Sequence, residues 1–237
     1  MHDRSLRDVA GAIEYTDLRK EITYRDVETM CTEAVMIGFH AVVLPSSLVS
    51  RASRDLRGVG SDVAPLVATV ISYPFGTQAP GVKAREAAAA LEAGAQELDI
   101  APHFGAILSG DWRSVREELS EIRRSAGDAI LKLMLETGRL QPEQIAEVCQ
   151  IAADEGFRFA TNTLGFRVVS TDPTAEGTAT AENIRSLRSL AAQALGIKAS
   201  GGVSGMSDVL DLLDAGADRV TVPVKPGLLR AMERESA

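Results

Sequence analysis

The chain has 237 residues with 25 basic and 33 acidic side chains, so its formal net charge is −8. Hydrophobic residues make up 45% and charged residues 24%, which is ordinary for a globular protein and argues against an intrinsically disordered chain. The acidic balance argues against a nucleic-acid-binding protein, because no basic stripe is available to meet phosphates. No apolar run approaches the length of a membrane span, so we expect no membrane partner.

The first eight residues are rich in charge and lack the apolar core of a secretory signal. Two cysteines occur, Cys31 and Cys149, and both fall inside helical patterns. We interpret them as buried thiols in a reducing compartment, not as a disulfide framework. The sequence therefore predicts a cytoplasmic protein.

One short pattern recurs along the chain. A helix-like run ends in glycine and a short apolar strand follows, with the glycines at positions 38, 94, 156 and 216. Glycine after the last helical residue is the usual left-handed helix cap. The copies lie 56, 62 and 60 residues apart, which is the length of two βα units in each case.

Strands that fit between these copies complete a set of eight. They are expected at residues 13–16, 41–44, 66–71, 97–100, 130–135, 159–161, 196–200 and 219–222. Helical spacing of apolar residues separates them, and Thr23 and Thr180 are expected to be N-caps. Eight alternating units in this length predict an α/β fold, a single (β/α)8 TIM barrel over residues 1–237. A doubly wound open sheet is the alternative, but residues 16–19 after the first strand are not its glycine-rich phosphate turn.

Several predicted strands carry charges that a purely structural core would not use. Period-two alternation places Lys132, Met134 and Glu136 on one face of their strand, with leucines on the other. The same alternation points further polar residues into the barrel: Glu14, Asp99, Thr161, Thr163, Lys198 and Ser200. Buried ionised groups cost several kcal/mol each unless they are paired. Two lysines and several carboxylates in one barrel are therefore either a charge cluster that only fills the interior or a catalytic network.

The chemistry open to this set is carbonyl chemistry. A desolvated lysine beside another cation has a lowered pKa, and its neutral amine can attack a carbonyl to form a Schiff base. A nearby carboxylate can carry the protons. Lys132, Lys198 and Asp99 together fit carbon–carbon bond cleavage or formation through an iminium.

The glycine-rich loop 200–205 follows the seventh predicted strand. Loops after strands seven and eight of such barrels often bind phosphate through backbone N–H groups, although a plain turn fits the composition equally well. Arg167 and Lys225 could add positive charge there. His40 precedes a strand and His103 follows one, and neither carries a strong signal. Zinc-binding spacings are absent from the sequence and no cofactor is expected, while a dispersed carboxylate site for magnesium stays open.

At these residues the chain resembles the deoxyribose-phosphate aldolase family. The matching segments, taken in order, are 64–71 with 73–76, 82–87, 94–99, 105–106 with 109–111, 131–137 and 196–203. The likeness runs from about Val9 to Val224. It implies a TIM-barrel class I aldolase that uses no metal, acts on a small carbonyl or sugar-like substrate, and often forms a homodimer.

The resemblance also implies roles for matching positions. Asp99 matches the family's catalytic aspartate, which works in proton transfer, and Lys198 matches the lysine that tunes the nucleophile. Lys132 matches an inner lysine on the fifth strand. Gly201 and Gly202, next to Ser200, match part of the phosphate-binding loop.

Three departures from the family pattern stand out. The Schiff-base lysine of the family lies in a stretch that here reads Thr161-Asn162-Thr163-Leu164-Gly165-Phe166, so Thr161 occupies the nucleophile's position. The paired serines that hold phosphate fall near Pro223 and Val224, and proline has no N–H to donate. The chain also lacks the C-terminal tyrosine of many relatives.

Three hypotheses follow. In the first, the protein is an aldolase-type lyase with a relocated nucleophile: Lys198 forms the Schiff base, Lys132 tunes it, Asp99 carries protons, and Glu136 or Glu14 positions water or substrate. The candidate binding residues are Ser200, Gly201, Gly202, Asn162, Gly165 and Arg167, and the substrate would differ from deoxyribose 5-phosphate. In the second, the carboxylates and lysines perform enolisation, dehydration or cyclisation without an iminium. In the third, the chain is a catalytically degenerate relative that binds a ligand.

Overall fold

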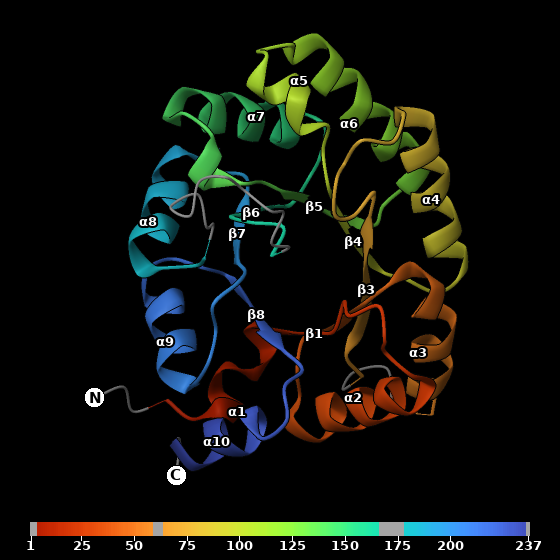
Figure 1. Ribbon diagram of the computed structural model, residues 1–237, viewed down its shortest axis with the longest axis vertical. Coiled ribbons are helices and arrows are strands. Elements are labelled where there is room, and N and C mark those ends of the chain that lie inside the picture. Colours follow the sequence, from red (N-terminus) through yellow and green to blue (C-terminus); the bar gives the residue numbers. More distant parts are fainter. Residues whose placement is uncertain (1–3, 59–63, 166–177, 236–237) are drawn as a thin grey trace.

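The computed structural model describes residues 4–58, 64–165 and 178–235. Eight parallel strands pair in sequence order and close into a barrel, which confirms the predicted fold (Figure 1). The strands are β1 (Ile13–Thr16), β2 (Ala41–Leu44), β3 (Leu66–Ile71), β4 (Glu97–Ile100), β5 (Ile130–Met134), β6 (Phe159–Thr161), β7 (Gly196–Ala199) and β8 (Arg219–Pro223). Because β1 pairs with both β2 and β8, the sheet has no free edge.

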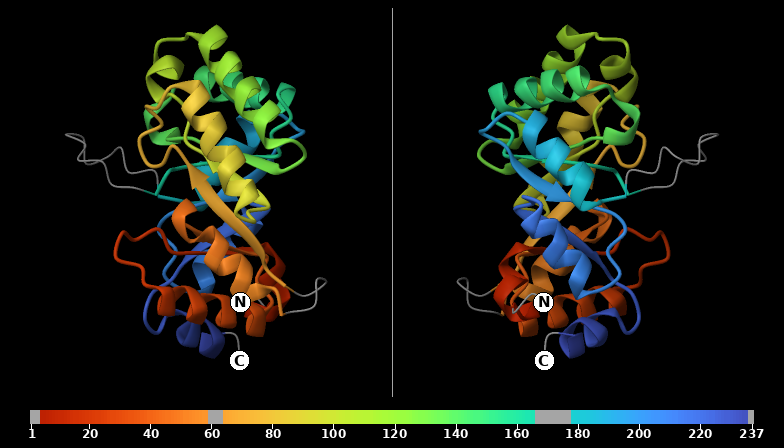
Figure 2. Two further views of the ribbon diagram at one scale, coloured as in Figure 1. Left: turned by 90° about the vertical axis from the view of Figure 1, so that its right-hand side faces the viewer. Right: turned by 90° about the vertical axis from the view of Figure 1, so that its left-hand side faces the viewer.

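Helices surround the barrel and separate the strands from solvent (Figures 1 and 2). The longer ones are α2 (Tyr24–Ile37), α3 (Val49–Leu56), α4 (Pro80–Glu92), α6 (Trp112–Ala126), α7 (Pro142–Asp154), α8 (Ala181–Leu190), α9 (Met206–Asp214) and α10 (Leu228–Glu235). Shorter ones are α1 (Leu6–Val9), α5 (Phe104–Leu108) and the 3-10 turns η1 (Ala10–Ala12), η2 (Ser46–Leu48) and η3 (Thr137–Arg139). In the described ranges, no helix is long and apolar enough to cross a membrane.

The predicted helix signals are confirmed where they can be checked. Gly38 follows α2 with φ 88°, in the left-handed region that a side chain would disfavour. Thr23 and Thr180 each close a capping box at the first turn of α2 and α8. Cys31 and Cys149 are both free and buried.

Alternation along the strands divides the core into two parts. Leu131 and Leu133 of β5 join the large apolar layer between strands and helices, while Lys132 between them is fully buried inside the barrel. A small apolar cluster of Ala41, Val43 and Ala68 fills another part of the interior.

The strands β5, β6 and β7 end earlier than some of the polar residues assigned to them. Glu136 and Ser200 follow the last residues of β5 and β7 by two and one positions, and Thr163 follows β6 by two. These three residues therefore lie in the loops at the carboxyl end of the barrel, where side chains and backbones of neighbouring loops compete for hydrogen bonds.

Candidate active site

Five charged side chains meet inside the barrel and form one ion network. Lys132 Nζ lies 2.5 Å from Glu14 Oε1 and 2.6 Å from Glu97 Oε2. The same ammonium group is 3.4 Å from Asp99 Oδ1. Lys198 Nζ lies 2.5 Å from Glu14 Oε2 and also contacts Asp99 Oδ2. Glu14 and Asp99 thus bridge the two lysines, and none of the five side chains is more than 3% exposed.

The strand register explains how distant parts of the sequence build this network. Asp99 of β4 is the register partner of Lys132 of β5, so their side chains project from adjacent positions on the inner face. Lys198 reaches them from β7, and Glu14 reaches them from β1. The predicted inward direction of these residues is confirmed by their burial and mutual contacts.

The ion pairs keep the buried side chains of Glu14 and Lys132 in their charged forms. Burial alone would raise the pKa of Glu14, but the ammonium groups of Lys132 and Lys198 overcome this and lower it to about 2. Burial alone would lower the pKa of Lys132, but the carboxylates of Asp99, Glu14 and Glu97 together raise it above its ordinary value. Lys132 is therefore a permanent cation in the physiological range, and the lowered pKa that Schiff-base formation needs is not found at this lysine.

Two members of this region were missed from the sequence. Glu97 lies two residues before Asp99 on β4, so the same alternation that pointed Asp99 inward could have identified it. His40 carries no strong signal in the sequence, yet its Nε2 lies 2.9 Å from Glu97 Oε1. No sequence signal indicates that contact, because His40 precedes β2 and meets Glu97 only when the barrel closes.

Thr161 lies next to Lys198. The two residues are register partners on β6 and β7, and Thr161 is fully buried. In the described part of the chain, neither Thr161 Oγ1 nor Thr221 Oγ1 has a hydrogen-bond partner. The barrel thus carries unsatisfied hydroxyl groups close to its charged network.

Glu136 lies apart from the ion network, at the carboxyl end of the barrel. Its Oε1 accepts hydrogen bonds from Thr163 Oγ1 at 3.0 Å and from the backbone N–H of Leu164 at 2.7 Å. Burial raises the pKa of Glu136 in spite of these bonds. Tyr73, in the loop after β3, is influenced by the same carboxylate: burial and the charge of Glu136 raise its pKa to about 12. Glu136 and Tyr73 therefore form a second polar group, which the sequence did not separate from the lysines.

Asn162 links β6 to β7 through backbone contacts. Its Oδ1 accepts the N–H of Ser200 at 2.7 Å and its Nδ2 donates to the carbonyl of Ser200 at 3.1 Å. Among the other candidate binding residues, Gly165 is exposed and donates its N–H to Thr163 Oγ1 at 3.1 Å. Arg167 lies outside the described residues. The N–H of Ser200 is thus already used within the protein.

Some of the backbone donors in the loops expected to hold phosphate are already used within the protein. A Cβ added to Gly202 would meet Thr178 Cγ2 at 2.8 Å, so the segment at Thr178 packs directly on the glycine-rich loop. After β8, Pro223 has no N–H, and the N–H of Val224 donates to Thr16 O at 2.9 Å. Ser200 and Val224 therefore use their N–H groups within the protein, and Pro223 has none to offer to a phosphate.

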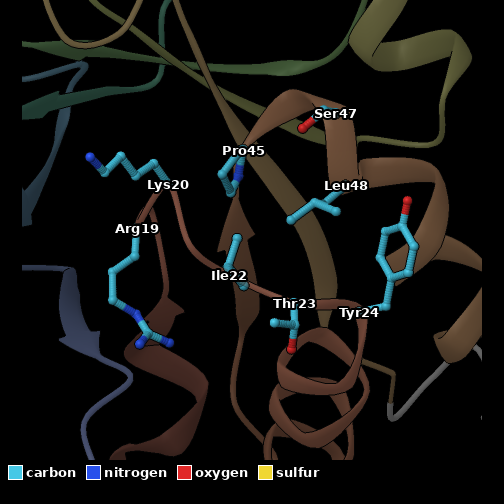
Figure 3. A pocket seen from close by; sticks show the side chains of 8 residues that line it. All are labelled: Arg19, Lys20, Ile22, Thr23, Tyr24, Pro45, Ser47 and Leu48. Carbon is cyan, nitrogen blue, oxygen red and sulfur yellow. The ribbon is translucent and has the colours of Figure 1, made fainter.

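A separate pocket lies on the loops that follow β1 and β2, with a volume of about 530 Å³. It is lined by Arg19, Lys20, Ile22, Thr23, Tyr24, Pro45, Ser47 and Leu48 (Figure 3). Arg19 is already paired with Asp17 at 2.5 Å. The two cations of the pocket point in different directions in Figure 3, so they do not converge on one anion.

A second buried ion pair lies outside the barrel, between α4 and α6. Lys83 Nζ is 3.0 Å from Glu118 Oε2 and also donates to Ala101 O at 3.0 Å. Glu118 Oε1 accepts the N–H of His103 at 3.1 Å. The pair thereby fixes the loop that follows β4. Within residues 4–58, 64–165 and 178–235, no group of three or more His, Cys, Asp or Glu residues is arranged to hold a metal ion.

The comparisons with known proteins agree with this architecture. The model of the DeoC/LacD family of aldolases matches residues 6–221. The chain is 34% identical over 221 residues to deoxyribose-phosphate aldolase 1 of Cutibacterium acnes, covering 93% of this chain and 96% of that protein. It is also 34% identical over 215 residues to the deoxyribose-phosphate aldolase of Thermococcus gammatolerans, covering 90% and 91%.

A solved structure gives the same result. The tetrameric deoxyribose phosphate aldolase of Aeropyrum pernix superimposes with a TM-score of 0.78 at 27% identity, covering 98% of this chain and 93% of that one. A family match over most of the chain, together with relatives above 30% identity, establishes the relationship. The chain belongs to the DeoC/LacD family of aldolases.

Proposed function

We propose that the protein is an aldolase-type lyase that acts on a carbonyl compound without a phosphate group, with Lys198 as the amine that forms the Schiff base. The observation that carries this proposal is the contact between Lys198 Nζ and the Asp99 carboxylate. Lys198 lies on β7, which pairs with the strand of Thr161. Lys198 is the better candidate of the two lysines, because Lys132 is held as a cation by three carboxylates.

The residues suggest the following division of labour. Lys198 must lose a proton before it attacks, and Asp99 is in contact to receive it. The amine then bonds to the carbonyl carbon, and the oxygen leaves as water, taking one proton from Asp99 and one from the amine nitrogen. In cleavage, the iminium draws the electron pair of the bond between the α- and β-carbons, while Asp99, again a carboxylate, takes the proton of the β-hydroxyl group. The β-fragment leaves as an aldehyde and an enamine remains on Lys198. Asp99 then protonates the α-carbon, and water hydrolyses the iminium to release the second product and the lysine. Lys132 keeps Glu14 ionised beside the amine throughout.

The loops after β7 and β8 support the proposal that the substrate carries no phosphate group. The N–H groups of Ser200 and Val224 already donate within the protein, and Pro223 has none. A polar group of the substrate could instead meet the unsatisfied hydroxyls of Thr161 and Thr221.

Borohydride trapping tests this function. The protein is incubated with acetaldehyde, pyruvate or deoxyribose 5-phosphate, reduced with borohydride, and analysed by peptide mass spectrometry. We expect an adduct on the peptide that contains Lys198, lost in Lys198→Met and kept in a surface control such as Lys20→Met. Failure to trap any of these carbonyls on folded protein would contradict the proposal, as would an adduct on another lysine.

A second function is favoured by one observation. Lys198 contacts two carboxylates, Glu14 and Asp99. As an ammonium group paired with them, Lys198 would act as an acid in enolisation, dehydration or cyclisation. Exchange of the α-protons of an aldehyde in D2O, without any trapped adduct, would support this reaction over the Schiff base. Binding without exchange or trapping would support a ligand-binding role.

The cellular compartment and the oligomeric state of the protein are proposed on separate grounds. We propose a cytoplasmic homodimer, on the basis of two buried thiols and the resemblance to aldolases that associate. Sedimentation velocity on the full chain tests the oligomeric state, and a monomer at micromolar concentration would contradict it.

A further inference from the structure

An unbroken series of charged contacts runs through the barrel from His40 to Lys198. His40 Nε2 lies 2.9 Å from Glu97 Oε1, and Glu97 Oε2 lies 2.6 Å from Lys132 Nζ. Lys132 Nζ is 2.5 Å from Glu14 Oε1, and Glu14 Oε2 is 2.5 Å from Lys198 Nζ. Every link is within direct contact distance, so a change of charge at one end acts on the next group without an intervening gap.

The two ends of the series differ in their access to solvent. The side chain of His40 is 18% exposed, whereas that of Lys198 at the other end is 3% exposed. His40 precedes the first residue of β2, and Glu97 is the first residue of β4. This end of the series is therefore at the amino-terminal end of the strands, opposite the loops that carry Glu136 and the glycine-rich segment.

The five side chains of the ion network carry unequal numbers of negative and positive charges. Glu14, Glu97 and Asp99 supply three negative charges, and Lys132 and Lys198 supply two positive ones, which leaves a net charge of −1 in the barrel. A net charge in a buried site is unfavourable unless a counter-charge is near. The contact between His40 and Glu97 places a titratable imidazole next to this excess negative charge.

We propose that His40 is the group through which the buried network exchanges protons with solvent, and that its protonation is coupled through the barrel to Lys198. Proton exchange by this route leaves the carboxyl end of the barrel free for substrate. The inference concerns the charge network itself and holds for either of the reactions proposed above.

The surroundings of His40 make Glu97 its main electrostatic partner. Of the described charged side chains that line the barrel near this end, Glu97 of β4 is the one in contact with it. Glu14 of β1 and Lys132 of β5 act through Glu97. Arg219 of β8 lies over the ring of Phe159, with 5.5 Å between its guanidinium carbon and the ring centre.

Titration of the histidine rings by NMR tests the coupling without any substrate. The 15N-labelled full chain contains three histidines, and His40→Gln and His103→Gln assign their signals. The titration midpoint of His40 is then measured in wild type, in Glu97→Gln and in Lys198→Gln. His103, which is exposed in the loop after β4, is the internal control in each spectrum.

The two variants are expected to shift the midpoint of His40 in opposite directions. Glu97→Gln removes a negative charge and lowers the midpoint, while Lys198→Gln removes a positive charge and raises it by about 1 pH unit, the order of magnitude expected for one partly screened buried charge. The midpoint of His103 stays unchanged. An unchanged midpoint of His40 in Lys198→Gln would overturn the proposal, since it would show that the charge of Lys198 does not reach His40.

A second measurement covers the case in which Lys198→Gln does not fold. The free energy of unfolding in urea is compared for wild type, His40→Gln and His103→Gln between about pH 5 and 8, where histidine titrates. We expect the pH dependence of His40→Gln to differ from wild type and that of His103→Gln to match it. Identical curves for wild type and His40→Gln would overturn the proposal.

Discussion

Thr161 on β6 is the strand-register partner of Lys198 on β7. The residue that the sequence resemblance places at the family's nucleophile position is therefore adjacent to the lysine that we propose as the nucleophile. Both side chains are buried inside the barrel. Because the two positions are adjacent, a lysine at either one would place its amine in the same region of the barrel without a change in the backbone.

Replacing Thr161 by lysine is expected to add a second site of Schiff-base formation. The new amine would project beside the Lys198 ammonium, and a neighbouring cation favours the neutral form of an amine. Borohydride trapping with acetaldehyde should then yield an adduct on the peptide containing residue 161. Thr161→Met is the control, because the methionine side chain is similar in length to lysine but has no amine. A folded Thr161→Lys variant with no adduct at this position would contradict the inferred placement.

Glu14→Gln is expected to destabilise the fold strongly. Glu14 contacts both lysines, so its neutralisation leaves two buried ammonium groups with fewer counter-charges. Breaking a buried ion pair from one side costs about 3–5 kcal/mol. Urea unfolding measures the loss, and the double variant Glu14→Gln/Lys132→Met should lose less than the sum of the two single variants. Additive losses would show that the two side chains are not coupled.

Protonation of Glu14 at low pH should remove the stabilisation that its carboxylate gives to the wild-type protein. The pKa of Glu14 is lowered from 4.5 to about 2, so its carboxylate stabilises the folded state above pH 4.5. That stabilisation declines as the pH falls from 4.5 through about 2. The free energy of unfolding of the wild type should therefore fall over this range more steeply than that of Glu14→Gln. Parallel curves for the two proteins would contradict the assignment.

Lys83→Met is expected to cost about 3–5 kcal/mol, because it leaves Glu118 buried without its cation. Arg113→Ala is a matched control on the exposed surface, where the 2.8 Å pair with Glu117 has side chains 87% and 63% exposed. The control should change the free energy of unfolding by less than about 1 kcal/mol. Equal losses in the two variants would show that burial does not set the strength of the Lys83 pair.

Inorganic phosphate is expected to leave the thermal stability of the protein unchanged at millimolar concentration. A ligand stabilises a protein only when it binds the folded state, and the N–H groups of Ser200 and Val224 are already used. Differential scanning fluorimetry with phosphate, and with chloride at equal ionic strength, measures the effect. A rise in Tm specific to phosphate would contradict a phosphate-free substrate.

The sequence by itself determined the barrel and the direction of its charges. Recurrent glycines gave the spacing of the βα units, and alternation along each strand pointed Lys132, Asp99 and Lys198 inward. Both signals are local, since a helix cap and a pleated strand depend on residues within a few positions of each other.

Only the tertiary structure decided which charges meet. Lys132 and Glu14 are 118 positions apart in the sequence, and His40 meets Glu97 across 57 positions. Alternation fixes the face on which a side chain lies, but its partners depend on how the barrel closes and on the stagger of its strands. For the same reason, the loss of free N–H groups after β7 and β8 became visible only when Asn162 and Thr16 were in place.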